Sequence, residues 1–122
     1  MREIKPNTFI FEFDNALQKD DCKNIIERFE DDKDEHYVGK VGQNLSEDLD
    51  IKKSTDLFIS GKEAWGDVDK IFFTALAKSL NKFKNEFDFF KGPFKDMGYA
   101  IQRTDVGQYY HWHIDGGSHE FS

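Results

Sequence analysis

The sequence predicts an α+β domain, in which two amphipathic helices accompany a few short strands. Apolar residues recur with the helical spacing i, i+3, i+4 and i+7 between Cys22 and Phe29, and again over about 20 residues from Trp65. Apolar and polar residues alternate at Thr8–Phe13, as they do in half-buried strands. A chain of 122 residues is long enough for one domain with a modest core.

The first two elements are a strand and a helix. The strand is predicted at Thr8–Phe13, where the alternation places three phenylalanines on one side, and Asp14-Asn15 ends it. A helix is predicted at Gln18–Glu30, with carboxylates in its first turn, where they favour the positive end of the helix dipole. We expect the acidic run 30–35 to be a solvated helix end, with a second metal site as the alternative.

Cys22 is the one cysteine of the sequence, so an internal disulfide is excluded. The residue lies on the apolar face of the first predicted helix. We therefore expect an inert thiol rather than a nucleophile, in a reducing, cytoplasmic setting.

The middle of the sequence alternates between loop, strand and helix. Residues 36–53 carry glycine and asparagine turn signals without a sustained period, and they predict a long surface loop that is a candidate lid. A second strand is predicted at Ser54–Ile59. The apolar stripe from Trp65 to Phe83 predicts a long helix, and we interpret the stripe as core packing.

The last part of the sequence predicts two strands joined by a turn. An aromatic connection at Glu86–Phe94 ends at Gly92-Pro93. The strands are predicted at Tyr99–Thr104 and at Gln108–Asp115, with Asp105–Gly107 as the turn between them.

Composition excludes two classes of partner. The net charge of −7 provides no basic patch for nucleic acid. Apolar runs are too short for a membrane span, the start of the sequence does not resemble a signal peptide, and the mean hydropathy of −0.73 is typical of a soluble protein. The sequence leaves the oligomeric state open.

The most informative pattern is the pair His113 and Asp115. Residues i and i+2 of a strand share one face and lie about 6.5–7 Å apart, so an imidazole and a carboxylate in this arrangement can bind one divalent metal. Two histidines and one carboxylate, with other positions open, are typical of non-haem Fe(II) oxygenases. His113 and Asp115 are therefore the predicted metal ligands.

The third ligand stays open at this point. His111 would share the strand face, but it lies about 13 Å from Asp115 in an extended strand, too far to converge on the same ion. We expect His111 to contact substrate or a neighbouring strand. His36, in the long loop, and His119, after the last strand, are the remaining candidates in this sequence.

A family resemblance rests on Ile101–Asp115. This stretch resembles the start of the catalytic core in Fe(II)/2-oxoglutarate-dependent dioxygenases, most closely the prolyl 4-hydroxylase-like branch. That pattern is a strand, a turn with glycine, a tyrosine three residues before the iron histidine, and His-x-Asp. Gly107, Tyr110, His113 and Asp115 occupy these positions.

The resemblance implies a particular fold. The opening strand, the helix Gln18–Glu30 and the long helix from Trp65 also resemble that branch. N-terminal helices would pack on the first strands of a double-stranded β-helix, a jelly-roll or cupin-like core that begins at about residue 99. Residues 1–122 would then be the N-terminal part of a single dioxygenase domain, with an incomplete core.

The resemblance also implies cofactors and chemistry. His113, Asp115 and a distal histidine would hold Fe(II), with 2-oxoglutarate as co-substrate and ascorbate as a further cofactor. Decarboxylation of 2-oxoglutarate to succinate and CO2 would accompany hydroxylation of a C–H bond, with a prolyl residue of a peptide or protein as first candidate. Tyr110 and Thr104 are the co-substrate candidates, since many relatives carry at the position of Thr104 a tyrosine that touches 2-oxoglutarate. We expect no catalytic residue beyond the metal ligands.

We expect the distal histidine and the basic residue that pairs with 2-oxoglutarate after Ser122, because that is where the family carries them. An exposed last strand would need covering, which also favours a fragment of a longer enzyme. This chain alone would then bind Fe(II) weakly, with little turnover. The alternatives are a non-catalytic interaction module, and a cupin-like metal-binding protein that uses His36 or His119.

Overall fold

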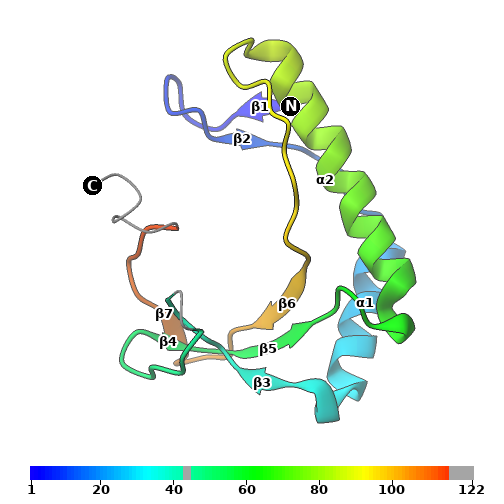
Figure 1. Cartoon of the computed structure of the whole chain (residues 1–122), viewed down its shortest axis with the longest axis vertical. Helices are drawn as coiled ribbons and strands as arrows, with labels where there is room; N and C mark the ends of the chain where they lie inside the picture. The colour runs from blue at the N-terminus through cyan, green and yellow to red at the C-terminus, as the bar shows by residue number, and fades with distance from the viewer. Residues whose placement is uncertain (43–44, 116–122) are drawn as a thin grey trace. The chain divides into compact units, whose positions relative to one another are not determined.

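A computed structural model describes residues 1–42 and 45–115, and its fold is α+β, as the sequence predicts. The chain divides into two compact units. Met1–Asp31 and Ile59–Tyr99 form the first, here called the helical unit. The second, here called the sheet unit, starts with Asp32–Phe58 and resumes at Ala100. Each unit is described by itself (Figure 1).

The helical unit contains two helices, one 3-10 turn and one short hairpin. Its elements are β1 (Arg2–Glu3), β2 (Phe11–Glu12), α1 (Lys19–Asp31), the 3-10 turn η2 (Glu63–Trp65) and α2 (Gly66–Glu86). β1 and β2 pair antiparallel, and α2 is the long green helix of Figure 1. α1 lies within one residue of its predicted range, and α2 lies within three residues of the range that its apolar stripe predicts.

The buried core of this unit lies where α1 meets the start of α2. Ile25 and Phe29 of α1 are buried, as are Trp65 and Val68. The two α1 residues are four positions apart and therefore share one helix face. Burial of apolar side chains of this size contributes about 1.5–3 kcal/mol each.

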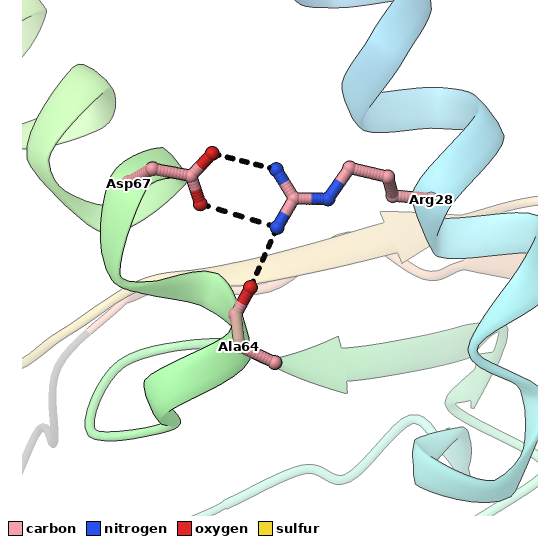
Figure 2. Close-up of polar contacts among 3 residues, drawn as sticks. All are labelled: Arg28, Ala64 and Asp67. Carbon is pink, nitrogen blue, oxygen red and sulfur yellow. Dashed lines mark hydrogen bonds and ion pairs between the residues drawn. The ribbon is translucent and has the colours of Figure 1, made fainter.

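A polar clamp flanks this core. Arg28 of α1 donates to both carboxylate oxygens of Asp67, over 2.8 and 3.1 Å, and to the Ala64 carbonyl oxygen over 2.6 Å (Figure 2). The guanidinium carbon also lies 4.7 Å from the centre of the Trp65 ring. One side chain thus joins α1 to the first turn of α2 through charge, hydrogen bonds and a cation–π contact.

The opening strand is shorter than predicted, because Phe9 adopts a positive φ of 57° that ends an extended run. Strand pairing is restricted to Phe11–Glu12. The predicted aromatic side is nevertheless present, since Phe9 and Phe11 each pack edge-on against Phe87 with ring centres 5.4 Å apart. The aromatic connection after α2 therefore packs against the β1–β2 hairpin through Phe87.

The interpretation of the α2 stripe as core packing holds for only part of the stripe. Val68 is buried, whereas Phe73 and Leu76 are 55% and 41% exposed. A hollow of about 210 Å³ lies along this face, with Leu80 and Phe94 also in its lining. The helical period correctly predicts the helix, but it does not predict how much of the apolar face is covered by other parts of the protein.

In the part of the sheet unit that the structure describes, there are one 3-10 turn and two small antiparallel sheets. Its elements are η1 (Lys33–Glu35), β3 (Tyr37–Val38), β4 (Lys52–Lys53), β5 (Thr55–Phe58), β6 (Ala100–Arg103) and β7 (Tyr109–Tyr110). The order in the larger sheet is β3-β5-β6, and β4 pairs with β7. The predictions of β5 and β6 are confirmed.

The loop predicted at residues 36–53 is structured at both of its ends. β3 pairs with β5, β4 pairs with β7, and an isolated bridge joins Val41 to Ser46. Short strands of two residues produce too little alternation to be recognised in sequence. The candidate lid is therefore shorter than predicted.

The strand predicted at Gln108–Asp115 is also too long, since β7 covers Tyr109–Tyr110 alone. Its partner β4 begins at Lys52, and the chain before it turns, with Ile51 donating to the Asp48 carbonyl oxygen over 3.0 Å. One last bond joins the His111 amide to the Ile51 carbonyl oxygen at 2.9 Å. His113 and Asp115 therefore follow the strand instead of lying in it.

Among residues 1–42 and 45–115, the helices are too short or too polar to cross a membrane.

Candidate metal centre

The turn before β7 positions the candidate site. The Gln108 amide donates to the Asp105 carbonyl oxygen over 2.9 Å, and the Gln108 side chain accepts from the Asp105 amide over 2.9 Å. Gly107 adopts a φ of 84°, which a residue with a Cβ rarely adopts. The predicted turn is confirmed, and it brings β7 back beside β4.

The side chains of His113 and Asp115 meet, although they do so from a bend and not from a strand. His113 Nε2 lies 3.3 Å from Asp115 Oδ1. Two donor atoms that each lie about 2.1 Å from one metal, at a right angle, are about 3.0 Å apart. The observed separation therefore fits two adjacent ligands of one ion.

The other ring nitrogen of His113 is already occupied. Nδ1 lies 2.8 Å from the His111 carbonyl oxygen. A carbonyl oxygen only accepts, so Nδ1 carries the proton and donates. Nε2 of a neutral ring then presents its lone pair toward Asp115, which is the tautomer that a metal ligand requires. The same 3.3 Å separation also suits an ion pair when Nε2 carries a proton.

Tyr110 stacks on the face of the His113 ring. The two rings are parallel within 8° and their centres lie 3.7 Å apart. Both residues line a hollow of about 450 Å³, together with His111 and Trp112. Tyr110 therefore lies beside the candidate ligand, while its contact with a co-substrate stays a prediction.

The remaining predicted residues are not gathered with the pair. Thr104 is exposed directly after β6 and is not in the lining of this hollow. The His111 ring packs on Tyr109, with centres 4.8 Å apart. Within residues 1–42 and 45–115, no three histidine, cysteine or acidic residues converge as metal ligands, so His36 does not complete the site. His119 lies outside the described residues.

Sequence reasoning missed a buried polar network next to β7. Lys52 of β4, Ser54 between the two strands and Asp56 of β5 are all buried, at alternate positions of the chain. Asp56 accepts from Ser54 Oγ over 2.8 Å and from Lys52 Nζ over 3.3 Å, while Gln102 donates to Ser54 over 3.1 Å. The i, i+2, i+4 spacing of three polar residues was the available signal, because it places them on one strand face.

The network also affects Tyr37 of β3. Burial raises the pKa of the Tyr37 phenol, and the nearby charge of Asp56 raises it further. Both effects disfavour a phenolate. This group therefore stays neutral across the physiological pH range.

Comparisons with models of protein families, with curated proteins and with solved structures found no match to this chain.

Proposed function

We propose that this chain carries two of the iron ligands, His113 and Asp115, of an Fe(II)- and 2-oxoglutarate-dependent dioxygenase. The observation that carries the proposal is the 3.3 Å approach of His113 Nε2 to Asp115 Oδ1, with Nδ1 held by the His111 carbonyl oxygen. An imidazole and a carboxylate in this geometry suit the facial site of that class of enzyme. The Gly107 turn and Tyr110 support the same assignment through the family pattern.

The proposal gives each residue a defined role. His113 would hold the metal through Nε2, and Asp115 would supply the anionic ligand. Tyr110 would fix the imidazole plane by stacking on its face, and the hollow lined by Tyr110 to His113 would receive substrate or co-substrate. When bound, the metal and 2-oxoglutarate supply the oxidation of a C–H bond. A prolyl residue of a peptide or protein is the first candidate substrate, with ascorbate as a further cofactor.

The proposal includes a fold and a setting. β6 and β7 would be the first strands of a double-stranded β-helix, and the third ligand would come from outside the described residues. A reducing cytoplasm would keep Cys22 a free thiol.

Metal binding tests the ligand assignment. Mn(II) serves as an air-stable probe for Fe(II), and the free ion is measured by electron paramagnetic resonance. We expect weak binding by the unchanged chain and at least about a tenfold loss in His113→Ala and in Asp115→Asn. His111→Ala is the matched control, because it removes an imidazole two residues away and keeps the carbonyl oxygen that holds Nδ1. Unchanged affinity in His113→Ala would overturn the assignment.

Two further measurements separate the alternatives. A loss of Mn(II) affinity in His119→Ala would place the third ligand in this sequence and favour the cupin-like protein. For the dioxygenase, we expect 2-oxoglutarate to alter the spectrum of the bound Mn(II), and succinate to form slowly when Fe(II), 2-oxoglutarate and O2 are supplied. Tight metal binding without any response to 2-oxoglutarate would contradict the dioxygenase.

A non-catalytic interaction module is the second candidate, and the exposure of Trp112 and Ile114 favours it. Both side chains follow β7, and they are 103% and 86% exposed. Large apolar groups that are exposed close together, here two residues apart, are typical of contact surfaces. A stable complex in light scattering that Trp112→Ser abolishes, together with no metal binding, would favour this function over the dioxygenase.

A further inference from the structure

We propose that Lys52 is a positioning residue for His113, acting through the ring of Tyr110. The contacts run within the sheet unit from Asp56 to Lys52, from Lys52 to Tyr110 and from Tyr110 to His113. The link to metal binding rests on the proposed function, whereas the positioning of the imidazole does not.

The first step is the burial of the Lys52 charge. The side chains of Lys52 and Asp56 are only 9% and 8% exposed, and their charged atoms lie 3.3 Å apart. Removing two charges from water costs several kcal/mol per ion, and a hydrophobic pair of similar size often stabilises a fold equally well. Stability alone therefore does not account for an ammonium group at this place.

The second step is that the ammonium group has little freedom to move. Ser54 Oγ donates to the second carboxylate oxygen of Asp56, and the same hydroxyl accepts from the Gln102 side chain. Gly39 covers the stem of Lys52 so closely that a Cβ there would lie 2.8 Å from Lys52 Cε and 2.1 Å from Ser54 Oγ. The Gly39 amide also donates to the Ser54 carbonyl oxygen over 3.1 Å. These contacts restrict Lys52 Nζ to one position.

The third step is the contact with Tyr110. Lys52 and Tyr110 are direct partners in the β4–β7 register. Lys52 Nζ lies 4.8 Å from the centre of the Tyr110 ring, within the range of a cation–π interaction. Because the Lys52 ammonium group has a fixed position, it favours one orientation of the Tyr110 ring. The two-residue strand β7 has few other contacts that could set this orientation.

The last step is the contact with the candidate ligand. The Tyr110 ring is parallel to the His113 imidazole within 8°, at a centre-to-centre distance of 3.7 Å. His113 lies after the end of β7, so no strand pairing of its own holds it. Three contacts orient this imidazole in the described part of the chain: the stacked Tyr110 ring, the bond to the His111 carbonyl oxygen and the approach of Nε2 to Asp115 Oδ1.

Nuclear magnetic resonance of the imidazole protons tests the positioning without any metal. A proton above a tyrosine ring resonates upfield, so His113 of the unchanged chain is expected upfield of His36. We expect Lys52→Met to lose most of this shift while the sheet signals stay in place. Lys53→Met is the matched control, because Lys53 is the exposed neighbour on the same strand. An unchanged His113 signal in folded Lys52→Met would overturn the proposal.

Two further variants keep the test decisive. If Lys52→Met does not fold, the double variant Lys52→Met/Asp56→Leu replaces the buried pair by apolar groups, and the same loss of shift is expected. In the background of Tyr110→Leu, removal of Lys52 is expected to leave the His113 signal unchanged. A further change there would show that Lys52 acts by another route and would contradict the proposal.

Metal affinity separates this proposal from the proposed function. If both hold, Lys52→Met weakens Mn(II) binding by about threefold to tenfold, and only when Tyr110 is present. If the His113 shift is lost in Lys52→Met but the unchanged chain binds no Mn(II), the positioning stands and the metal assignment fails. If Mn(II) binds through His113 and Lys52→Met changes neither the shift nor the affinity, the positioning fails alone.

Discussion

Arg28 and Asp67, 39 positions apart in the chain, form a two-bond ion pair between α1 and the first turn of α2. The same guanidinium donates to Ala64 and lies over Trp65. The side chain of Asp67 is 64% exposed, so solvent weakens the electrostatic attraction between Arg28 and Asp67. The three hydrogen bonds of the guanidinium still fix the position of the Arg28 side chain. The pair is therefore a connection between helices rather than a large source of stability.

Replacing Arg28 by Met tests this connection. We expect a loss of about 1–2 kcal/mol in the free energy of unfolding, since the hydrogen bonds to charged groups and the cation–π contact are lost together. Urea unfolding followed by circular dichroism measures it. Arg2→Met is the control, because the Arg2 side chain is 70% exposed against 30% for Arg28, and its change is expected within about 0.5 kcal/mol. Equal losses in the two variants would contradict the assigned role.

The same pair predicts a dependence on pH in acid. The hydrogen bond from Arg28 lowers the pKa of Asp67 in the folded chain. A lowered folded pKa contributes stability above the ordinary value of about 3.9, and this contribution is lost as pH falls through the folded pKa. Arg28→Met should therefore show a smaller loss of stability in this range than the unchanged chain. Parallel acid unfolding curves would refute the prediction.

Tyr37 predicts a dependence on pH in alkali. Burial, aided by Asp56, raises the phenol pKa, so the folded chain holds the proton more tightly than the unfolded chain. This contribution is complete below the ordinary value of about 10 and is lost as pH rises through the folded pKa. We expect Tyr37→Phe to lose less stability than the unchanged chain in this range. Urea unfolding at several alkaline pH values measures the difference, and identical pH profiles would exclude it.

The buried Lys52–Asp56 pair predicts a non-additive result. Lys52→Ala leaves Asp56 charged and buried, and the expected loss is about 3–5 kcal/mol in the free energy of unfolding. Lys52→Met/Asp56→Leu should lose much less, because no unpaired charge remains. The exposed Lys53→Ala is expected to change stability by less than about 0.5 kcal/mol. Additive losses in the double variant would show that the two charges are independent.

Two glycines provide a matched pair. A Cβ at Gly39 would meet Ser54 and Lys52 at distances that require the network to shift, and we expect Gly39→Ala to cost about 1–3 kcal/mol. At Gly66, the first residue of α2, a Cβ has open space, and Gly66→Ala is expected to be neutral or to stabilise by up to about 1 kcal/mol. Thermal unfolding distinguishes these outcomes, and a neutral Gly39→Ala would mean that the network rearranges at low cost.

The proximity of His113 and Asp115 was predictable from the sequence, but the geometry in which they meet was not, and their role as metal ligands stays a prediction. His113 and Asp115 follow from a two-residue spacing, yet they meet in a bend, because β4 supplies partners for only two residues of β7. Lys52 was not predicted, since its contact with Tyr110 depends on how two distant strands pair. The exposed face of α2 was not predicted either, because a helical period is the same whether or not a partner covers it.

By itself the sequence determined the elements that depend on neighbouring residues. The two helices, β5, β6 and the turn at Gly107 follow from local hydrogen bonds, apolar period and backbone freedom. Tertiary structure alone decided which side chains meet: Arg28 with Asp67, and Lys52 with Tyr110. Such contacts join residues far apart in the chain, so their geometry arises only when the surrounding elements pack.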